Sequence, residues 1–209
     1  HRASRQYVAF VDGRPKTPRG TWRHWLRFDD ENLRQHVLSE RAAKEAGDDA
    51  QESITHYEVV EEFAIGKSGR VVSKMKFKLE TGRTHQIRVQ AAHEGLPLVG
   101  DRTYHPLYHA AKQDRVIVPV EFTRQALHAE TLELDHPEQP GKRMTWRAPW
   151  PADLRKLEAA LRQSPPRAPA SSALLARRGR VRRPALRPDR QYVCAKSPTN
   201  RREAQQSST

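Results

Sequence analysis

The sequence predicts an α+β fold, in which flanking helices cover a β-sheet. Residues 71–79 alternate apolar and polar side chains, as expected of a strand that buries one face. Residues 84–93 and 152–161 instead space their apolar side chains as a helix does. A chain of 209 residues can bury one ordinary core and carry an appendage.

The N-terminal third of the chain predicts strands on either side of an ambiguous segment. Residues 6–11 are rich in Val, Tyr and Phe and end at an Asp-Gly turn dipeptide. A second apolar stretch covers residues 20–26, and residues 55–63 predict a further strand. Between these two, residues 29–50 are ambiguous, although residues 41–46 favour a helix.

Residues 71–79 place two kinds of side chain on opposite faces of the predicted strand. The apolar residues Met75, Phe77 and Leu79 fall on the core face, and the alternating lysines fall on the other. The lysines are either solvated on an open sheet face, or they line a surface that binds nucleic-acid phosphates. They are Lys74, Lys76 and Lys78.

The helix predicted at residues 84–93 begins beside a turn that carries an arginine. Thr84 is the expected N-cap of this helix, and Gly95 is the expected C-terminal cap. Arg88 then lies about one turn into the helix. Together with Arg83 in the preceding turn, the helix N-terminus makes a site that favours an anion.

The rest of the chain predicts a strand pair, a final helix and a tail. Residues 117–122 and 126–134 predict the strands, and residues 152–161 predict an amphipathic helix. Residues 163–209 hold 11 Lys and Arg against 2 acids and are rich in proline, so we expect this tail to be disordered. Residues 1–162, with a net charge of +4, form the expected folded domain.

The composition limits the classes of protein that fit. The net charge of +13 favours a polyanionic partner. A single cysteine excludes an internal disulfide and a cysteine-based zinc site, and it suits a reducing compartment. No apolar run reaches about 18 residues, so no membrane-spanning segment is expected.

Three stretches resemble one family of RNA-modifying enzymes, the RluA-type pseudouridine synthases. Their signature is similar to residues 78–106, KLETGRTHQIRVQAAHEGLPLVGDRTYHP. The segment that closes their catalytic domain resembles residues 124–154, RQALHAETLELDHPEQPGKRMTWRAPWPADL. The strand that carries their active-site tyrosine resembles residues 5–13, RQYVAFVDG. The resemblance extends over residues 6–161.

The resemblance implies a fold, an activity and a set of site residues. The fold would be a mixed, largely antiparallel sheet with flanking helices, lacking its N-terminal part. The activity would be isomerisation of uridine to pseudouridine in ribosomal or transfer RNA, in the cytoplasm, without cofactor, metal or membrane. Tyr7 and Arg88 would be the catalytic residues. The residues expected to contact RNA are Lys76, Lys78, Arg83, Thr84, His85 and Gln86.

One element of the family pattern does not occur in this sequence. The family's catalytic aspartate lies in an Arg-Leu-Asp segment upstream of the tyrosine strand, and the 209 residues contain no such segment. We therefore expect a partial catalytic domain with an exposed sheet edge, inactive by itself. Two alternatives remain: a non-catalytic RNA-binding half-domain, or a protein that binds RNA through its basic tail alone.

Overall fold

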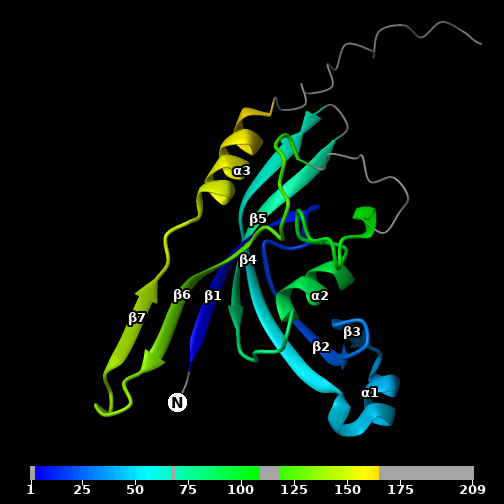
Figure 1. Cartoon of the computed structure of the whole chain (residues 1–209), viewed down its shortest axis with the longest axis vertical. Helices are drawn as coiled ribbons and strands as arrows, with labels where there is room; N and C mark the ends of the chain where they lie inside the picture. Colours follow the sequence, from blue (N-terminus) through cyan, green and yellow to red (C-terminus); the bar gives the residue numbers. More distant parts are fainter. Residues whose placement is uncertain (1–2, 67–68, 109–117, 165–209) are drawn as a thin grey trace, which may run out of the picture. The chain divides into compact units, whose positions relative to one another are not determined.

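A computed structural model describes residues 3–66, 69–108 and 118–164, and within them the chain forms one antiparallel sheet flanked by helices (Figure 1). Its strand order is β3-β2-β4-β5-β1-β6-β7, and each neighbouring pair is antiparallel. The strands are β1 (Ser4–Asp12), β2 (Arg19–Asp29), β3 (Arg34–Leu38), β4 (Gln51–Ile65), β5 (Arg70–Leu79), β6 (Leu127–Asp135) and β7 (Arg143–Arg147). The helices are α1 (Glu40–Ala46), α2 (Gln86–His93) and α3 (Ala152–Gln163), with short 3-10 turns η1 (Gly47–Asp49) and η3 (Pro106–Tyr108). The predicted α+β class is confirmed.

Helices α2 and α3 lie on opposite faces of the sheet, and each face has its own core. On the α2 face, Ile87 and Ala91 pack against apolar residues of β1, β2 and β5. On the α3 face, Leu154, Leu157 and Leu161 pack against Phe10 and other apolar residues. The last helix thus buries the three-leucine stripe that the sequence predicted. No described helix is long and apolar enough to cross a membrane.

Strand β5 confirms the predicted alternation. Met75 and Phe77 are buried on the α2 face, so the lysines between them point to the α3 face. Lys74 is covered by α3, because its Nζ lies 2.9 Å from Glu158 Oε1 and 4.5 Å from the Trp150 ring centroid. Lys76 and Lys78 lie farther along the strand and are exposed.

Helix α2 begins later than predicted and ends as predicted. His85 has a left-handed backbone, with φ of 54°, and the helix starts only at Gln86. The prediction of Thr84 as the N-cap is therefore wrong. At the other end Gly95, with φ of 75°, donates its N–H to the Ala92 carbonyl at 3.1 Å, which confirms it as the cap.

The strand predicted at residues 117–122 is wrong in its described part, since residues 118–122 pair with no strand. Val118 is instead buried in the core of the α3 face, so its apolar character reflects packing rather than sheet pairing. The partner strand predicted at 126–134 is confirmed as β6. The predicted disorder of residues 163–209 lies outside the described residues from 165 onward.

Candidate functional site

Arg88 and Asp101 form a buried ion pair beside α2. Arg88 Nε donates to Asp101 Oδ2 and Arg88 Nη2 to Asp101 Oδ1, each at 2.7 Å. The Asp101 side chain is fully buried, and that of Arg88 is 11% exposed. Burial alone would lower the pKa of Arg88, but the hydrogen bonds and charge of Asp101 outweigh it and raise that pKa. Arg88 is therefore held as a cation in one orientation.

The loop after α2 fixes Asp101 from the other side. Asp101 Oδ1 also accepts the backbone N–H groups of Thr103, at 3.0 Å, and Tyr104, at 3.2 Å. The preceding Gly100 has φ of 76°, and a Cβ there would lie 2.0 Å from the Arg124 carbonyl oxygen. The backbone of this turn thus touches the segment before β6, which leaves the carboxylate little freedom to move.

Tyr104 joins this pair to a histidine and to strand β3. Its ring centroid lies 5.0 Å from the Arg88 guanidinium carbon. Its hydroxyl accepts the Gln35 backbone N–H at 2.8 Å and lies 3.0 Å from His85 Nδ1. Burial raises the pKa of Tyr104, and burial together with the Arg88 charge lowers the pKa of His85. Both shifts favour the neutral forms of these two side chains beside the Arg88 cation.

Gln86 supports the turn between β5 and α2. Its Oε1 accepts the Arg83 backbone N–H at 2.9 Å and the Thr81 hydroxyl at 3.0 Å. Its Nε2 donates to Ile54 O and Thr55 Oγ1. Gln86 is only 2% exposed, so its place fits a structural role rather than the RNA contact that the sequence suggested.

Arg83 and Thr84 lie in the same turn, at the edge of a polar hollow. The hollow has a volume of about 460 Å³, and Gln35, Asp48 and Asp49 also line it. Arg83 Nε donates to the Glu52 carbonyl at 3.3 Å, while Thr84 is exposed. Both residues thus remain at the surface, where RNA could reach them.

Tyr7 lies on β1 on the same side of the sheet as α2. It is half-buried and packs against the core that includes Ile87 and Ala91. The pairing of β1 with β6 changes register between Gln6 and Tyr7, because Glu130 of β6 has no partner on β1, whereas the pairing of β1 with β5 stays regular here. The structure therefore brings Tyr7 and the helix that carries Arg88 to one face.

The predicted RNA-contact residues do not form one cluster. Arg83, Thr84 and His85 lie in the turn before α2, whereas Lys76 and Lys78 point from β5 to the α3 face. The structure thus places Lys76 and Lys78 on the face of the sheet opposite Tyr7 and Arg88. Their individual roles stay predictions.

Two side chains that contact Arg88, those of Asp101 and Tyr104, could not be identified as its neighbours from the sequence. Asp101 lies 13 positions after Arg88, and nothing in that spacing indicated that its carboxylate would bind Arg88. Tyr104 gave no signal, because its three contacts come from β3, the turn before α2 and the helix itself. In the described part of the chain, no group of three or more His, Cys, Asp and Glu could hold a metal ion.

Comparison with known proteins shows which family this chain is similar to. Residues 1–93 match the family model described as RNA pseudouridylate synthase. Together with the relatives below, this match confirms the predicted resemblance to the RluA-type pseudouridine synthases.

The relatives are ribosomal large subunit pseudouridine synthases D. The chain is 48% identical to that of Pseudomonas aeruginosa over 114 residues, which cover 53% of this chain and 33% of that protein. It is 44% identical to that of Xanthomonas campestris pv. campestris over 138 residues, which cover 63% and 37%. The chain thus spans about a third of the length of these relatives.

Solved structures agree on the fold. Human RNA pseudouridylate synthase domain containing 1 superposes with a TM-score of 0.54 at 24% identity, covering 79% of this chain and 68% of that one. Human RNA pseudouridylate synthase domain containing 4 gives 0.51 at 18% identity, covering 78% and 64%. The α+β sheet described above is therefore the fold of these domains.

Proposed function

We propose that this chain is part of an RNA pseudouridine synthase and contributes the tyrosine and the arginine of its active site. The observation that carries the proposal is the buried Arg88–Asp101 pair, which lies in the segment that resembles the synthase signature. Ribosomal RNA is the proposed substrate, because the relatives are named for the large ribosomal subunit. Transfer RNA is the alternative substrate.

Arg88 has donors to spare for this role. A guanidinium has five N–H donors. Asp101 engages two of them, which leaves three. Because the group is largely buried, each remaining donor interacts more strongly than it would in water. Arg88 can thus hold a second carboxylate or a uracil oxygen while Asp101 keeps it in place.

The second carboxylate would be the family's catalytic aspartate. That aspartate either attacks the ribose or stabilises the detached uracil before the uracil rejoins the sugar through carbon. The Arg-Leu-Asp segment does not occur in the 209 residues. The proposal therefore assigns the aspartate to protein outside these residues, and it assigns to Tyr7 the stacking or deprotonation of a uridine flipped out of the RNA.

The experiment compares two proteins on one RNA. The 209-residue chain and a version extended by the coding sequence upstream of the His1 codon are incubated with large-subunit ribosomal RNA carrying tritium at uridine C5. Isomerisation replaces the C5–H bond by a bond to ribose, so it releases the tritium. We expect release by the extended protein. Absence of release from ribosomal and transfer RNA alike would contradict the proposal.

Arg88→Lys tests the arginine while keeping its charge. Lysine lacks the planar fork that binds a carboxylate through two hydrogen bonds. We expect turnover of the extended protein to fall on the order of 100-fold, with RNA affinity nearly unchanged. Arg41→Lys on exposed α1 is the matched control. Equal turnover of the two variants would remove Arg88 from the site.

Tyr7→Phe tests the tyrosine in the same assay. It removes one hydroxyl and keeps the ring that packs against the α2-face core. We expect loss of the chemical step with RNA still bound. An unchanged rate would limit Tyr7 to stacking and packing.

The lack of an Arg-Leu-Asp segment in this sequence favours a second candidate, a non-catalytic RNA-binding protein. Such a protein binds RNA with an affinity that falls steeply with salt and leaves uridine unchanged. If only the basic tail binds, deletion of residues 164–209 abolishes RNA binding. Binding that survives this deletion assigns it to the folded part.

A further inference from the structure

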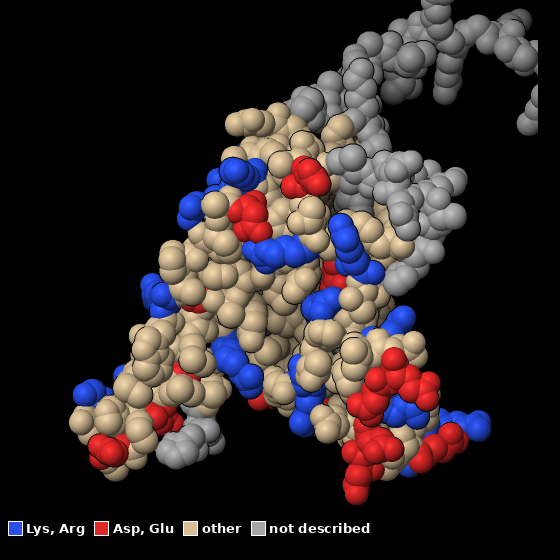
Figure 2. Space-filling view, in the orientation of Figure 1, with Lys and Arg blue, Asp and Glu red and all other residues tan. Residues whose placement is uncertain are grey.

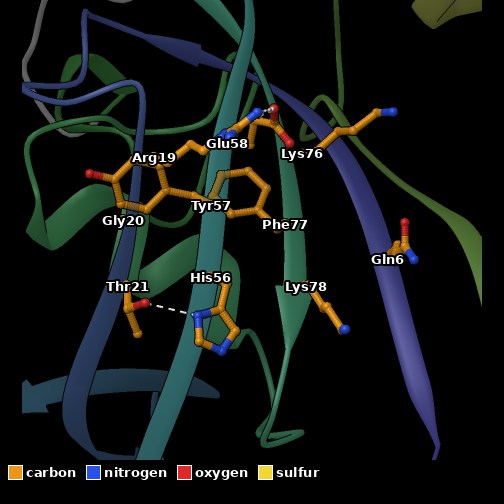
Figure 3. Close-up of a pocket in the computed structure, with 10 residues that line it drawn as sticks. All are labelled: Gln6, Arg19, Gly20, Thr21, His56, Tyr57, Glu58, Lys76, Phe77 and Lys78. Carbon is orange, nitrogen blue, oxygen red and sulfur yellow. Dashed lines mark hydrogen bonds and ion pairs between the residues drawn. The ribbon is translucent and has the colours of Figure 1, made fainter.

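The α3 face of the sheet has an open hollow beyond the part that α3 covers (Figure 3). Its volume is about 540 Å³, and strands β1, β2, β4 and β5 supply its lining. Gln6 pairs with Lys78 across β1 and β5, and Glu58 pairs with Lys76 across β4 and β5, so these side chains share one face. The hollow is therefore on the opposite side of the sheet from Tyr7 and Arg88.

Most of the charge in the hollow is internally balanced. Arg19 donates to Glu58 Oε1 from Nε at 3.1 Å and from Nη2 at 2.6 Å. His56 lies 2.8 Å from the Thr21 hydroxyl and 2.5 Å from Glu80 Oε1. These side chains use their hydrogen-bonding groups on one another, which holds them in place along the hollow.

Lys76 and Lys78 are the exception. Both are exposed, and neither has a hydrogen bond or an ion pair with any described residue. In Figure 3 no dashed line joins either lysine to the other labelled residues. Two positions apart on a strand, they lie about 6.6 Å from each other along it. The hollow thus presents two adjacent, uncompensated positive charges.

We infer that this hollow is a second RNA-contact surface, where Lys76 and Lys78 bind backbone phosphates on the side of the sheet opposite the candidate active site. The inference rests on the proposed function for the identity of the ligand. Fixed hydrogen-bonding groups around two free ammonium groups suit a polyanion that is read by charge rather than by sequence.

The chain provides a path between the two surfaces. Strand β5 ends at Leu79, and the turn that follows carries Arg83 and leads into α2 on the other face (Figure 1). One RNA can therefore pass round this end of the sheet, from the lysines past Arg83 to Arg88. The acidic side chains gathered over α1 repel a polyanion and direct it away from that side of the turn (Figure 2).

The test is a double charge reversal, Lys76→Glu with Lys78→Glu, in the full 209-residue chain. Binding to a large-subunit ribosomal RNA transcript is measured across a range of salt concentrations. We expect affinity to fall on the order of tenfold, and the slope of log affinity against log salt to shrink by about 1.5 units, as two phosphate contacts are lost. The control is Lys44→Glu, an exposed lysine on α1.

The outcomes separate this inference from the proposed function. Reduced affinity and slope in the double variant, but not in the control, support the surface even if no pseudouridine forms. An unchanged affinity and slope overturn it even if the extended protein is an active synthase, and so does an equal loss in the control.

Discussion

The two faces of the sheet use charge in opposite ways. On the α2 face, Arg88 is buried and paired with Asp101 through two hydrogen bonds. On the α3 face, Lys76 and Lys78 are exposed and lack a partner among the described residues. A buried charge held in one geometry suits chemistry at a fixed atom, whereas exposed charges suit contact with a flexible polyanion. One sheet thus carries a buried, paired cation on one face and exposed, unpaired cations on the other.

The largest expected effect comes from breaking the buried pair. Asp101→Ala leaves Arg88 buried without its carboxylate, so the free energy of unfolding should fall by about 3–5 kcal/mol. Urea unfolding at pH 7 measures it. The control is Glu45→Ala in the exposed Arg41–Glu45 pair, which should cost less than about 0.5 kcal/mol. Similar losses in the two variants would mean that the pair on the α2 face is not energetically distinct.

A smaller difference in the free energy of unfolding is expected among variants of the three lysines of β5. Lys74→Met removes an ion pair with Glu158 and a contact with the Trp150 ring, and should cost about 1–2 kcal/mol. The loss is limited, because Glu158 keeps Arg162 as a second partner. Lys76→Met and Lys78→Met should change stability by less than about 0.5 kcal/mol. Equal costs for all three in urea unfolding would contradict the assigned environments.

The smallest expected effect is a dependence of folding stability on pH, which comes from two histidines on the α2 face. Burial lowers the pKa values of His24 and His85, so the unfolded chain binds more protons than the folded one near neutrality. Stability should be constant above about pH 7 and decline as the pH falls below about 6.5, the unfolded histidine pKa. His85→Gln should make the decline shallower between pH 7.5 and 5.5. An identical pH profile would show that His85 does not contribute.

Local patterns predicted the parts of this fold that depend on local chemistry. The alternation in β5, the leucine stripe of α3 and the Gly95 cap follow from backbone periodicity and from glycine's freedom at positive φ. The left-handed His85 did not follow, since Thr84 had the better capping side chain. The ring of His85 lies beside the Tyr104 hydroxyl, a contact across 19 positions that no local pattern indicates.

The candidate site could be predicted only in part, because some of its contacts join residues that are distant in the sequence. A motif resemblance indicated Arg88 and Tyr7, but the partner of Arg88 comes from 13 positions away through a tertiary turn. The lysines of β5 were correctly placed on one strand face. Which helix covers that face depends on the whole sheet, so their separation from Arg88 required the structure.

The lack of space around Gly100 limits which residues this position can accept. Its turn touches the Arg124 carbonyl, and Arg124 in turn holds Asp153 at the start of α3 through hydrogen bonds of 2.6 and 3.0 Å. Any side chain at position 100 would displace the neighbouring Asp101 and, with it, Arg88. In a saturation mutagenesis scan selected for function, codon 100 should therefore tolerate as few replacements as codon 88, although glycine has no group that could react.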